Sequence, residues 1–197
     1  MNQQATPIRA FIAIELPEAV KQELSSLQRR LGVEPATGIK WVAPEGIHLT
    51  LKFLGWVAPD RVETIKAALA DSMAGFEPFE LKLSGLGAFP NFRRMNVIWC
   101  GLSGDLARLA ALQQSVEKFV SPLGFPTEKR AFSPHLTLAR LRDEVAPETK
   151  LKLSEKLTRN KFEPNLPIPV ESVHLMQSQL FPTGAAYTSL GSFPLRS

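Results

Sequence analysis

A short amphipathic motif occurs twice in this sequence, and it limits what the chain can fold into more than any other feature. I-H-L-T-L-K-F-L-G stands at Ile47–Gly55, and P-H-L-T-L-A-R stands at Pro134–Arg140. Alternate side chains of a strand share a face, so each copy places its His and Thr on one face and its leucines on the other. The same alternation puts Phe53 on the leucine face. We therefore expect two strands that bury leucines and present polar side chains.

One copy alone is also what an ordinary amphipathic strand with a surface histidine looks like. Two of the three histidines of the chain, however, lie in these copies. The repetition favours two walls of one cleft over two unrelated strands.

The elements that precede the two copies follow the same order. A strand at Arg9–Leu16 and a helix from Pro17 to Gly32 precede the first copy. A strand at Val97–Leu102 and a helix beginning near Asp105 precede the second. Helical spacing of apolar residues and a terminal glycine support both helices. We infer a single domain, residues 1–197, made of two pseudo-symmetric lobes that face each other across a cleft.

The rest of the chain yields less specific expectations. They are a strand at Phe79–Leu83, a loop at Gly85–Arg94, a charged surface helix within Pro147–Asn160, and a terminal hairpin of Val170–Leu180 and Ala185–Leu190 with its turn at Pro182–Gly184.

Composition describes an ordinary globular protein, with 44% hydrophobic and 21% charged residues. The net charge of +4 permits a polyanionic partner without demonstrating one. The single cysteine, Cys100, lies in an apolar run and is predicted to be a buried thiol. We find no signal-like N-terminus and no window of about 20 apolar residues, so we expect a cytoplasmic protein without a membrane partner.

The chemistry that the motifs can perform follows from two imidazoles without a nearby nucleophile. Paired cysteines, a metal-binding histidine pair, a glycine-rich phosphate loop and a nucleophile elbow are all missing from the sequence. Two histidines can divide the roles of general base and general acid in an in-line displacement at phosphorus. Thr50 and Thr137 share the histidine faces and can donate to the phosphate oxygens.

The sequence resembles the 2H phosphoesterase superfamily, and within it the RNA 2′,3′-cyclic phosphodiesterase family, also called 2′-5′ RNA ligase. The paired H-L-T-L segments carry the superfamily resemblance. The family resemblance rests in addition on R-A-F-I-A-I-E-L-P at Arg9–Pro17, on R-A-F-S-P-H-L-T-L-A-R at Arg130–Arg140, and on S-x-L with G-x-x-Y around Ser178–Tyr187. The likeness covers nearly the whole chain.

This resemblance implies a bilobal α+β fold, in which each lobe has an antiparallel sheet with outer helices and a central cleft holds both motifs. It implies hydrolysis of RNA 2′,3′-cyclic phosphate ends to 2′-phosphomonoesters without metal or cofactor, with reversible 2′-5′ joining as a second activity. The partner is then RNA with such an end, tRNA fragments being one source, and the protein is expected to be a monomer. By analogy His48 protonates the leaving 3′ oxygen and His135 activates water.

Three further residues are site candidates on weaker grounds. Arg140 matches an arginine of the family, but in a regular strand it falls opposite His135, so it reaches phosphate only where the strand ends or bulges. Arg130 is either an RNA-backbone contact or a solvated charge. Phe11 is either a ring for a terminal base or part of the core. His174 has no Thr two places on and is predicted to be structural.

Two other functions agree with the same residues. One is a nucleotide- or RNA-binding module that does not turn over its ligand. The other is a related 2H enzyme that acts on small cyclic nucleotides or on 2′-5′ oligoadenylate.

Overall fold

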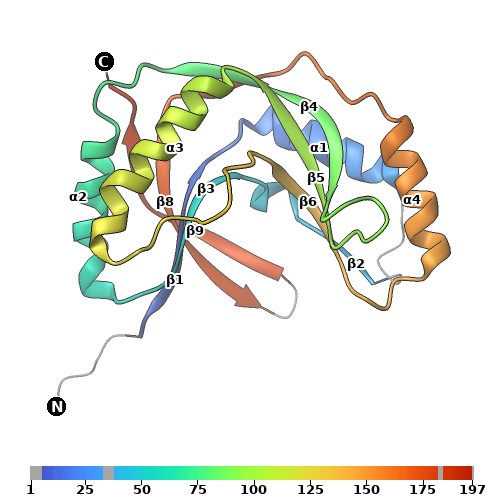
Figure 1. The fold of residues 1–197 in the computed structure, drawn as a ribbon, viewed down its shortest axis with the longest axis horizontal. Helices are drawn as coiled ribbons and strands as arrows, with labels where there is room; N and C mark the ends of the chain where they lie inside the picture. The colour runs from blue at the N-terminus through green and yellow to red at the C-terminus, as the bar shows by residue number, and fades with distance from the viewer. Residues whose placement is uncertain (1–5, 33–37, 182–183, 197) are drawn as a thin grey trace.

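The computed structural model describes residues 6–32, 38–181 and 184–196. Within these residues the chain has an α+β fold, and nine strands join in one curved sheet of order β7-β4-β5-β6-β3-β1-β8-β9, with β2 beside β6 (Figure 1). The strands are β1 (Ile8–Ile14), β2 (Ile39–Trp41), β3 (Leu49–Val57), β4 (Phe79–Phe89), β5 (Val97–Gly104), β6 (Leu136–Leu141), β7 (Pro167–Val170), β8 (Ser172–Phe181) and β9 (Gly184–Pro194). The helices are α1 (Glu18–Leu31), α2 (Val62–Ser72), α3 (Leu106–Val120) and α4 (Pro147–Arg159).

Apart from β2, the sheet consists of two four-stranded halves that meet where β3 lies beside β6. One half has the order β9-β8-β1-β3, and the other has the order β6-β5-β4-β7. The neighbouring strands pair antiparallel, as the family resemblance implies. The two sheets expected from that resemblance are therefore halves of one sheet.

The two halves of the chain exchange strands and helices. β4 follows the first motif in sequence but pairs with β5, and β8 follows the second motif but pairs with β1. The helices follow the same rule, since α2 packs against α3 and α1 packs against α4. Figure 1 shows α2 and α3 side by side at the left of the view and α4 at the right. Neither half of the chain builds its half of the sheet alone.

Local sequence explains the first helix. Val20, Leu24, Leu27 and Leu31 recur at helical spacing, and all four are buried. Gly32 ends α1 in the left-handed conformation with φ of 52°, which favours glycine. The helix predicted from Pro17 to Gly32 is confirmed.

The predicted loop at Gly85–Arg94 is wrong in its first half, because β4 continues to Phe89. The register between β4 and β5 shifts between Leu83 and Leu86, so an extra residue forms a bulge there. Gly85 adopts a φ of 71° inside this bulge. The glycine that suggested a loop therefore marks a bulge in a strand that resumes its pairing.

Other expectations are confirmed in outline. A helix occupies most of the charged segment after Pro147, although Leu153 and Leu157 on it are buried. Cys100 is fully buried. The terminal hairpin is formed by β8 and β9, while its predicted turn at Pro182–Gly184 falls partly outside the described residues. Among the helices of the described residues, none is long and apolar enough to span a membrane.

A buried ion pair ties the first motif strand to α3. Lys52 is 2% exposed, and its Nζ donates to Glu117 at 2.6 Å and to the carbonyl oxygen of Pro126 at 2.9 Å. Gln113 donates to the second carboxylate oxygen of Glu117 at 3.3 Å. Burying two charges is tolerated here because both have partners. The pair also anchors the segment that leads from α3 to the second motif.

We expect Lys52→Met to lower the free energy of unfolding by about 3–5 kcal/mol, because it leaves a carboxylate buried without its cation. Urea unfolding at neutral pH measures this loss. Lys66→Met, which removes the exposed pair with Glu63, is the matched control and should cost about 0–1 kcal/mol. The double variant Lys52→Met/Glu117→Leu should recover most of the loss. If Lys52→Met and Lys66→Met lower the free energy of unfolding equally, the buried ion pair does not contribute as described.

Candidate active site

Both histidines lie immediately before a strand at the junction of the two half-sheets. His48 precedes β3, His135 precedes β6, and the ladder between these strands pairs Leu49 with Leu136. Leu49 and Leu136 are 1% and 0% exposed, so they point into the core. The residues on either side of each leucine consequently point to the opposite face of the sheet.

Counting outward from this pair in an antiparallel ladder places His48 opposite Thr137 and Thr50 opposite His135. All four side chains of the two H-x-T motifs therefore share one face of the sheet. The two histidines are diagonal neighbours, whose Cα atoms are typically about 7–8 Å apart. A group the size of a phosphate fits between two imidazoles at that spacing.

The strands separate just beyond this contact. Residues Ala139–Leu141 of β6 pair with β2 instead of β3. Gln28 of α1 donates to the carbonyl oxygens of Val42 at 2.8 Å and Leu138 at 3.0 Å, and so holds β2 against β6. The joining of the two halves is thus limited to the part of the sheet that carries the histidines.

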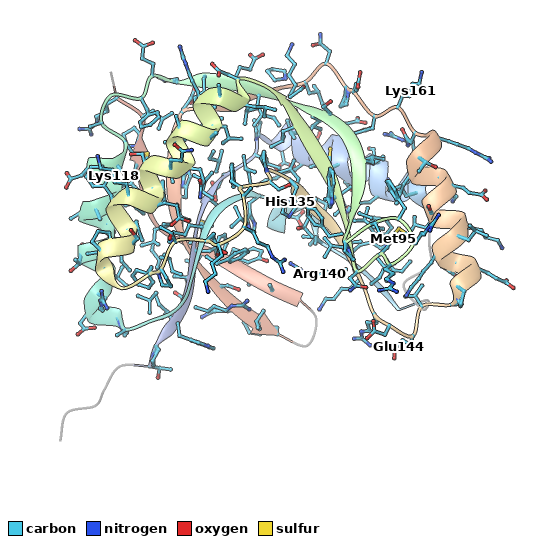
Figure 2. The ribbon with its side chains drawn as sticks, viewed as in Figure 1. Met95, Lys118, His135, Arg140, Glu144 and Lys161 are labelled. Carbon is cyan, nitrogen blue, oxygen red and sulfur yellow. The ribbon has the colours of Figure 1, made fainter. Side chains whose placement is uncertain are left out.

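A β-bulge at the same position of both motifs changes which later side chains face the site. On β6, Ala139 and Thr137 pair with the consecutive residues Ile98 and Trp99, so Leu138 is extra. This bulge brings Arg140 to the histidine face, where its side chain is exposed. The sequence allowed Arg140 to reach phosphate only if the strand ended or bulged there, and the strand does bulge. Figure 2 shows the side chains of His135 and Arg140 both toward the middle of the molecule.

The corresponding bulge on β3 corrects the expectation for Phe53. Ala13 and Ile12 pair with Thr50 and Lys52, so Leu51 is the extra residue. The alternation therefore reverses after Leu51, and Phe53 turns from the leucine face to the histidine face, where it is 58% exposed. The first motif thus places an aromatic ring where the second places Arg140.

His48 is held by its backbone and by two rings. Its Nδ1 lies 2.8 Å from the carbonyl oxygen of Gly46, which can only accept, so Nδ1 carries the proton and donates. The imidazole stacks on Phe11 at 4.6 Å between centroids and meets the edge of Tyr187 at 5.0 Å. In the neutral ring Nε2 is then the nitrogen with a free lone pair.

His135 has a matching environment in the other half. Its Nδ1 lies 2.7 Å from the carbonyl oxygen of Ser133, again two residues earlier in the chain. Its imidazole meets Phe89 edge-on at 4.9 Å and lies 6.4 Å from the ring of Trp99. Both histidines are therefore fixed in the same tautomer, with Nε2 available for a reacting group.

Burial lowers the pKa of His48 from 6.5 to about 4, because the charged imidazolium is poorly solvated there. The hydrogen bond to Gly46 and the charge of Glu15 act in the opposite direction but are smaller effects. His48 is consequently neutral at pH 7 in the free protein.

The face around the histidines carries hydroxyls and unpaired cations. Thr50 and Thr137 are half-buried, and neither side chain has a hydrogen-bond partner among the described residues. Arg140 lies directly opposite Lys40 of β2, although like charges in such a pair repel. The salt bridges of the described residues include neither of these cations. An anion is the species that this arrangement favours.

The remaining candidates are placed as follows. Arg130 is exposed in the segment before His135, and a role in RNA binding stays a prediction. Phe11 is 3% exposed and supports His48 by stacking, so the packing interpretation accounts for its position, while a contact with a base stays a prediction. His174 forms a hydrogen bond of 2.9 Å between its Nε2 and Ser172 Oγ. No group of three potential metal ligands occurs in the part of the chain that the structure describes.

A family model described as "LigT like Phosphoesterase" matches residues 14–99 and again residues 102–187, each match containing one of the two motifs. The chain belongs to this phosphoesterase family. The double match agrees with the exchange of equivalent elements between the two halves of the chain.

Curated relatives match along most of their length. The chain is 34% identical over 188 residues to the RNA 2′,3′-cyclic phosphodiesterase of Methanothermobacter thermautotrophicus, covering 95% of this chain and 99% of the relative. It is 36% identical over 194 residues to the protein of the same name from Thermus thermophilus, covering 96% of this chain and 91% of that relative.

Solved structures share the fold. A protein from Thermus thermophilus superposes with a TM-score of 0.77 at 30% identity, covering 96% of this chain and 98% of that one. Escherichia coli LigT complexed with phosphate superposes with a TM-score of 0.73 at 25% identity, covering 98% of this chain and 100% of LigT.

Two further aromatic residues lie beside the histidines, and neither was predicted from the sequence as a site residue. Tyr187 reaches His48 from β9, and a Cβ on Gly46 would lie 3.0 Å from its ring, so a larger residue at position 46 would press against the tyrosine. Trp99 similarly covers Gly87, where a Cβ would lie 2.1 Å from the indole. The sequence did offer a signal for Tyr187, because it ends the G-x-x-Y segment of the family resemblance and is the only tyrosine of the chain. Its contact with a residue so distant in sequence depends on strand register.

The lowered pKa of His48 predicts how stability depends on pH. Between pH 6.5 and about 4 the unfolded chain binds a proton at His48 that the folded protein does not, so stability falls as the pH falls through this window. We expect a loss on the order of 1–2 kcal/mol from this group between pH 7 and pH 5. Urea unfolding at the two pH values measures it.

His48→Gln provides the comparison, because glutamine retains a donor but does not titrate. The variant should show a shallower fall in stability between the two pH values than the wild type. If both proteins lose the same free energy of unfolding, His48 is not a buried neutral imidazole.

Proposed function

We propose that this protein hydrolyses RNA 2′,3′-cyclic phosphate ends to 2′-phosphomonoesters by general acid–base catalysis with His48 and His135. The observation that carries the proposal is the register that pairs Leu49 with Leu136, because it brings both H-x-T motifs to one face. The relatives named RNA 2′,3′-cyclic phosphodiesterase support the choice of substrate.

In the proposed mechanism the cyclic phosphate binds between the two imidazoles, in a cleft between the two lobes. One Nε2 takes a proton from water as its oxygen attacks phosphorus. The other imidazole donates a proton to the 3′ oxygen as its bond to phosphorus breaks. Opposed placement of the two groups suits an in-line displacement.

The charge of the phosphate is the second requirement. Thr50 and Thr137 can donate hydroxyl protons to its non-bridging oxygens, and Arg140 supplies a cation on the same face. The similar Escherichia coli LigT has been solved in complex with phosphate, which supports phosphate as a ligand of this fold. We propose that no metal is needed, since two protonatable groups and three donors meet the needs of the displacement.

The division of roles between the histidines is open to two versions. The family resemblance makes His48 the acid. The pKa of about 4 favours the opposite version, in which neutral His48 is the base and His135 is the acid. The first version requires that the negative charge of bound substrate raise the pKa of His48.

Joining of RNA ends through a 2′-5′ bond is the same displacement with the 5′ hydroxyl of a second RNA in place of water, and the 3′ oxygen again leaves; cleavage of that 2′-5′ bond is its reverse. The same pair of histidines serves both directions. Rates on RNA ends, small cyclic nucleotides and 2′-5′ oligoadenylate, measured side by side, rank the substrate classes. Binding of a 2′-phosphorylated nucleotide without turnover of any cyclic phosphate identifies a binding module instead.

We expect His48→Ala and His135→Ala each to lower kcat by about 10²–10⁴-fold, because each removes a positioned acid or base. The assay follows the 2′-phosphate released from an RNA with a 2′,3′-cyclic end, using protein treated with a chelator. His174→Ala is the matched control, since it removes the remaining histidine, and it should retain kcat. Undiminished activity in both motif variants rejects the mechanism.

A nucleoside phosphodiester with a p-nitrophenolate leaving group identifies the acid. This leaving group departs without a proton, so loss of the general acid should matter far less than loss of the general base. If His48 is the base, His135→Ala recovers most of the wild-type rate on this substrate and His48→Ala does not. The reverse pattern assigns His48 as the acid. Equal losses in both variants contradict a division of roles.

A further inference from the structure

Two large aromatic side chains lie exposed on β3, beyond the first motif. Phe53 is 58% exposed, and Trp56 is 73% exposed, which is the largest value among the exposed large hydrophobic residues of the described chain. Single exposed apolar side chains are common on protein surfaces. What distinguishes these two is their position relative to His48.

The register of β1 against β3 fixes that position. Phe53 pairs with Phe11, and Trp56 pairs with Arg9. Phe11 and Arg9 are alternate residues of β1, so their side chains share a face. Phe11 stacks on His48, and therefore Trp56 and Arg9 lie on the histidine face.

The two pairs form successive rows across the sheet. The row nearer to His48 contains Phe11 and Phe53, and the next row contains Arg9 and Trp56. Two residues along a strand correspond to a spacing of about 7 Å. The second row continues through Ser178 to Tyr187. Burial raises the pKa of Tyr187, and the charges of Arg140 and Arg9 act in the opposite direction.

This face is not covered by the helices. The buried apolar residues of the helices belong to the main core. Phe11, Ala13 and Met176 form a separate small cluster against which Tyr187 packs. Arg9 is exposed, and the salt bridges of the described residues do not include it. An exposed indole next to an unpaired guanidinium, one row beyond Phe11 and Phe53 on the histidine face, suits a base and a phosphate.

We propose that Trp56 and Arg9 form a subsite for the nucleotide on the 5′ side of the one that bears the cyclic phosphate. The base of that nucleotide stacks on Trp56, and Arg9 contacts the phosphodiester that links the two nucleotides. The subsite rests on the function proposed above and adds to it a preference for RNA ends over mononucleotides. Stacking on an indole is open to every base, so the subsite selects length and not sequence.

The test compares two substrates that end in the same nucleoside 2′,3′-cyclic phosphate, one a dinucleotide and one a mononucleotide. The measured quantity is the ratio of their kcat/KM values. We expect Trp56→Ala to lower this ratio by about 5- to 150-fold, the effect of losing one stacked base, while kcat/KM for the mononucleotide stays unchanged. Trp56→Phe should retain most of the ratio.

Three comparisons make the result specific. When the dinucleotide has an abasic 5′ residue, the wild type should show a ratio of kcat/KM values as low as that of Trp56→Ala with the normal dinucleotide. Arg9→Gln should lower kcat/KM for the dinucleotide and weaken its dependence on salt. Leu151→Ala, which removes a 63% exposed side chain from α4, is the matched control and should leave the ratio unchanged.

The subsite is rejected if Trp56→Ala leaves the ratio unchanged or lowers kcat/KM for both substrates equally. If the wild type hydrolyses neither substrate, the proposed function fails instead. In that case calorimetric binding of the 2′-phosphorylated dinucleotide and mononucleotide tests the subsite alone. Trp56→Ala should then weaken binding of the dinucleotide but not of the mononucleotide. If the variant and the wild type bind the dinucleotide equally, the subsite is rejected.

Discussion

The pairing of Leu49 with Leu136 is the contact on which the site depends. Both leucines are anchored in the core, so their neighbours must point to the open face. A slip of one residue in either strand would turn one histidine into the core and expose a leucine in its place. Burial of two leucines therefore determines the orientation of four polar side chains that make no contribution to the core themselves.

The two bulges make a nearly symmetric arrangement chemically unequal. After Leu138 the reversed alternation presents Arg140, whereas after Leu51 it presents Phe53. At this equivalent position, one motif strand thus presents a cation and the other an aromatic ring. If the substrate is the nucleotide proposed above, the cation suits its phosphate and the aromatic ring suits its base.

Sequence periodicity predicted the face of each histidine, the inward leucines and the apolar stripe of α1, because each follows from a regular period. It failed at Phe53 and Gly85, since a bulge adds one residue without a characteristic residue type and reverses the alternation beyond it. Arg140 could be placed only conditionally for the same reason. Tyr187 and Trp99 depend on pairing between distant strands, which a single sequence does not encode locally.

The exchange of β4 and β8 between the halves has a consequence for how such a chain can arise. A polypeptide containing one motif and its own strands would lack the neighbour that its first strand requires, and it would offer its last strand to another molecule. Two copies would satisfy each other reciprocally, in the manner of a domain-swapped dimer. Covalent duplication makes that partnership permanent and frees each copy to vary, so that one can carry Arg140 where the other carries Phe53.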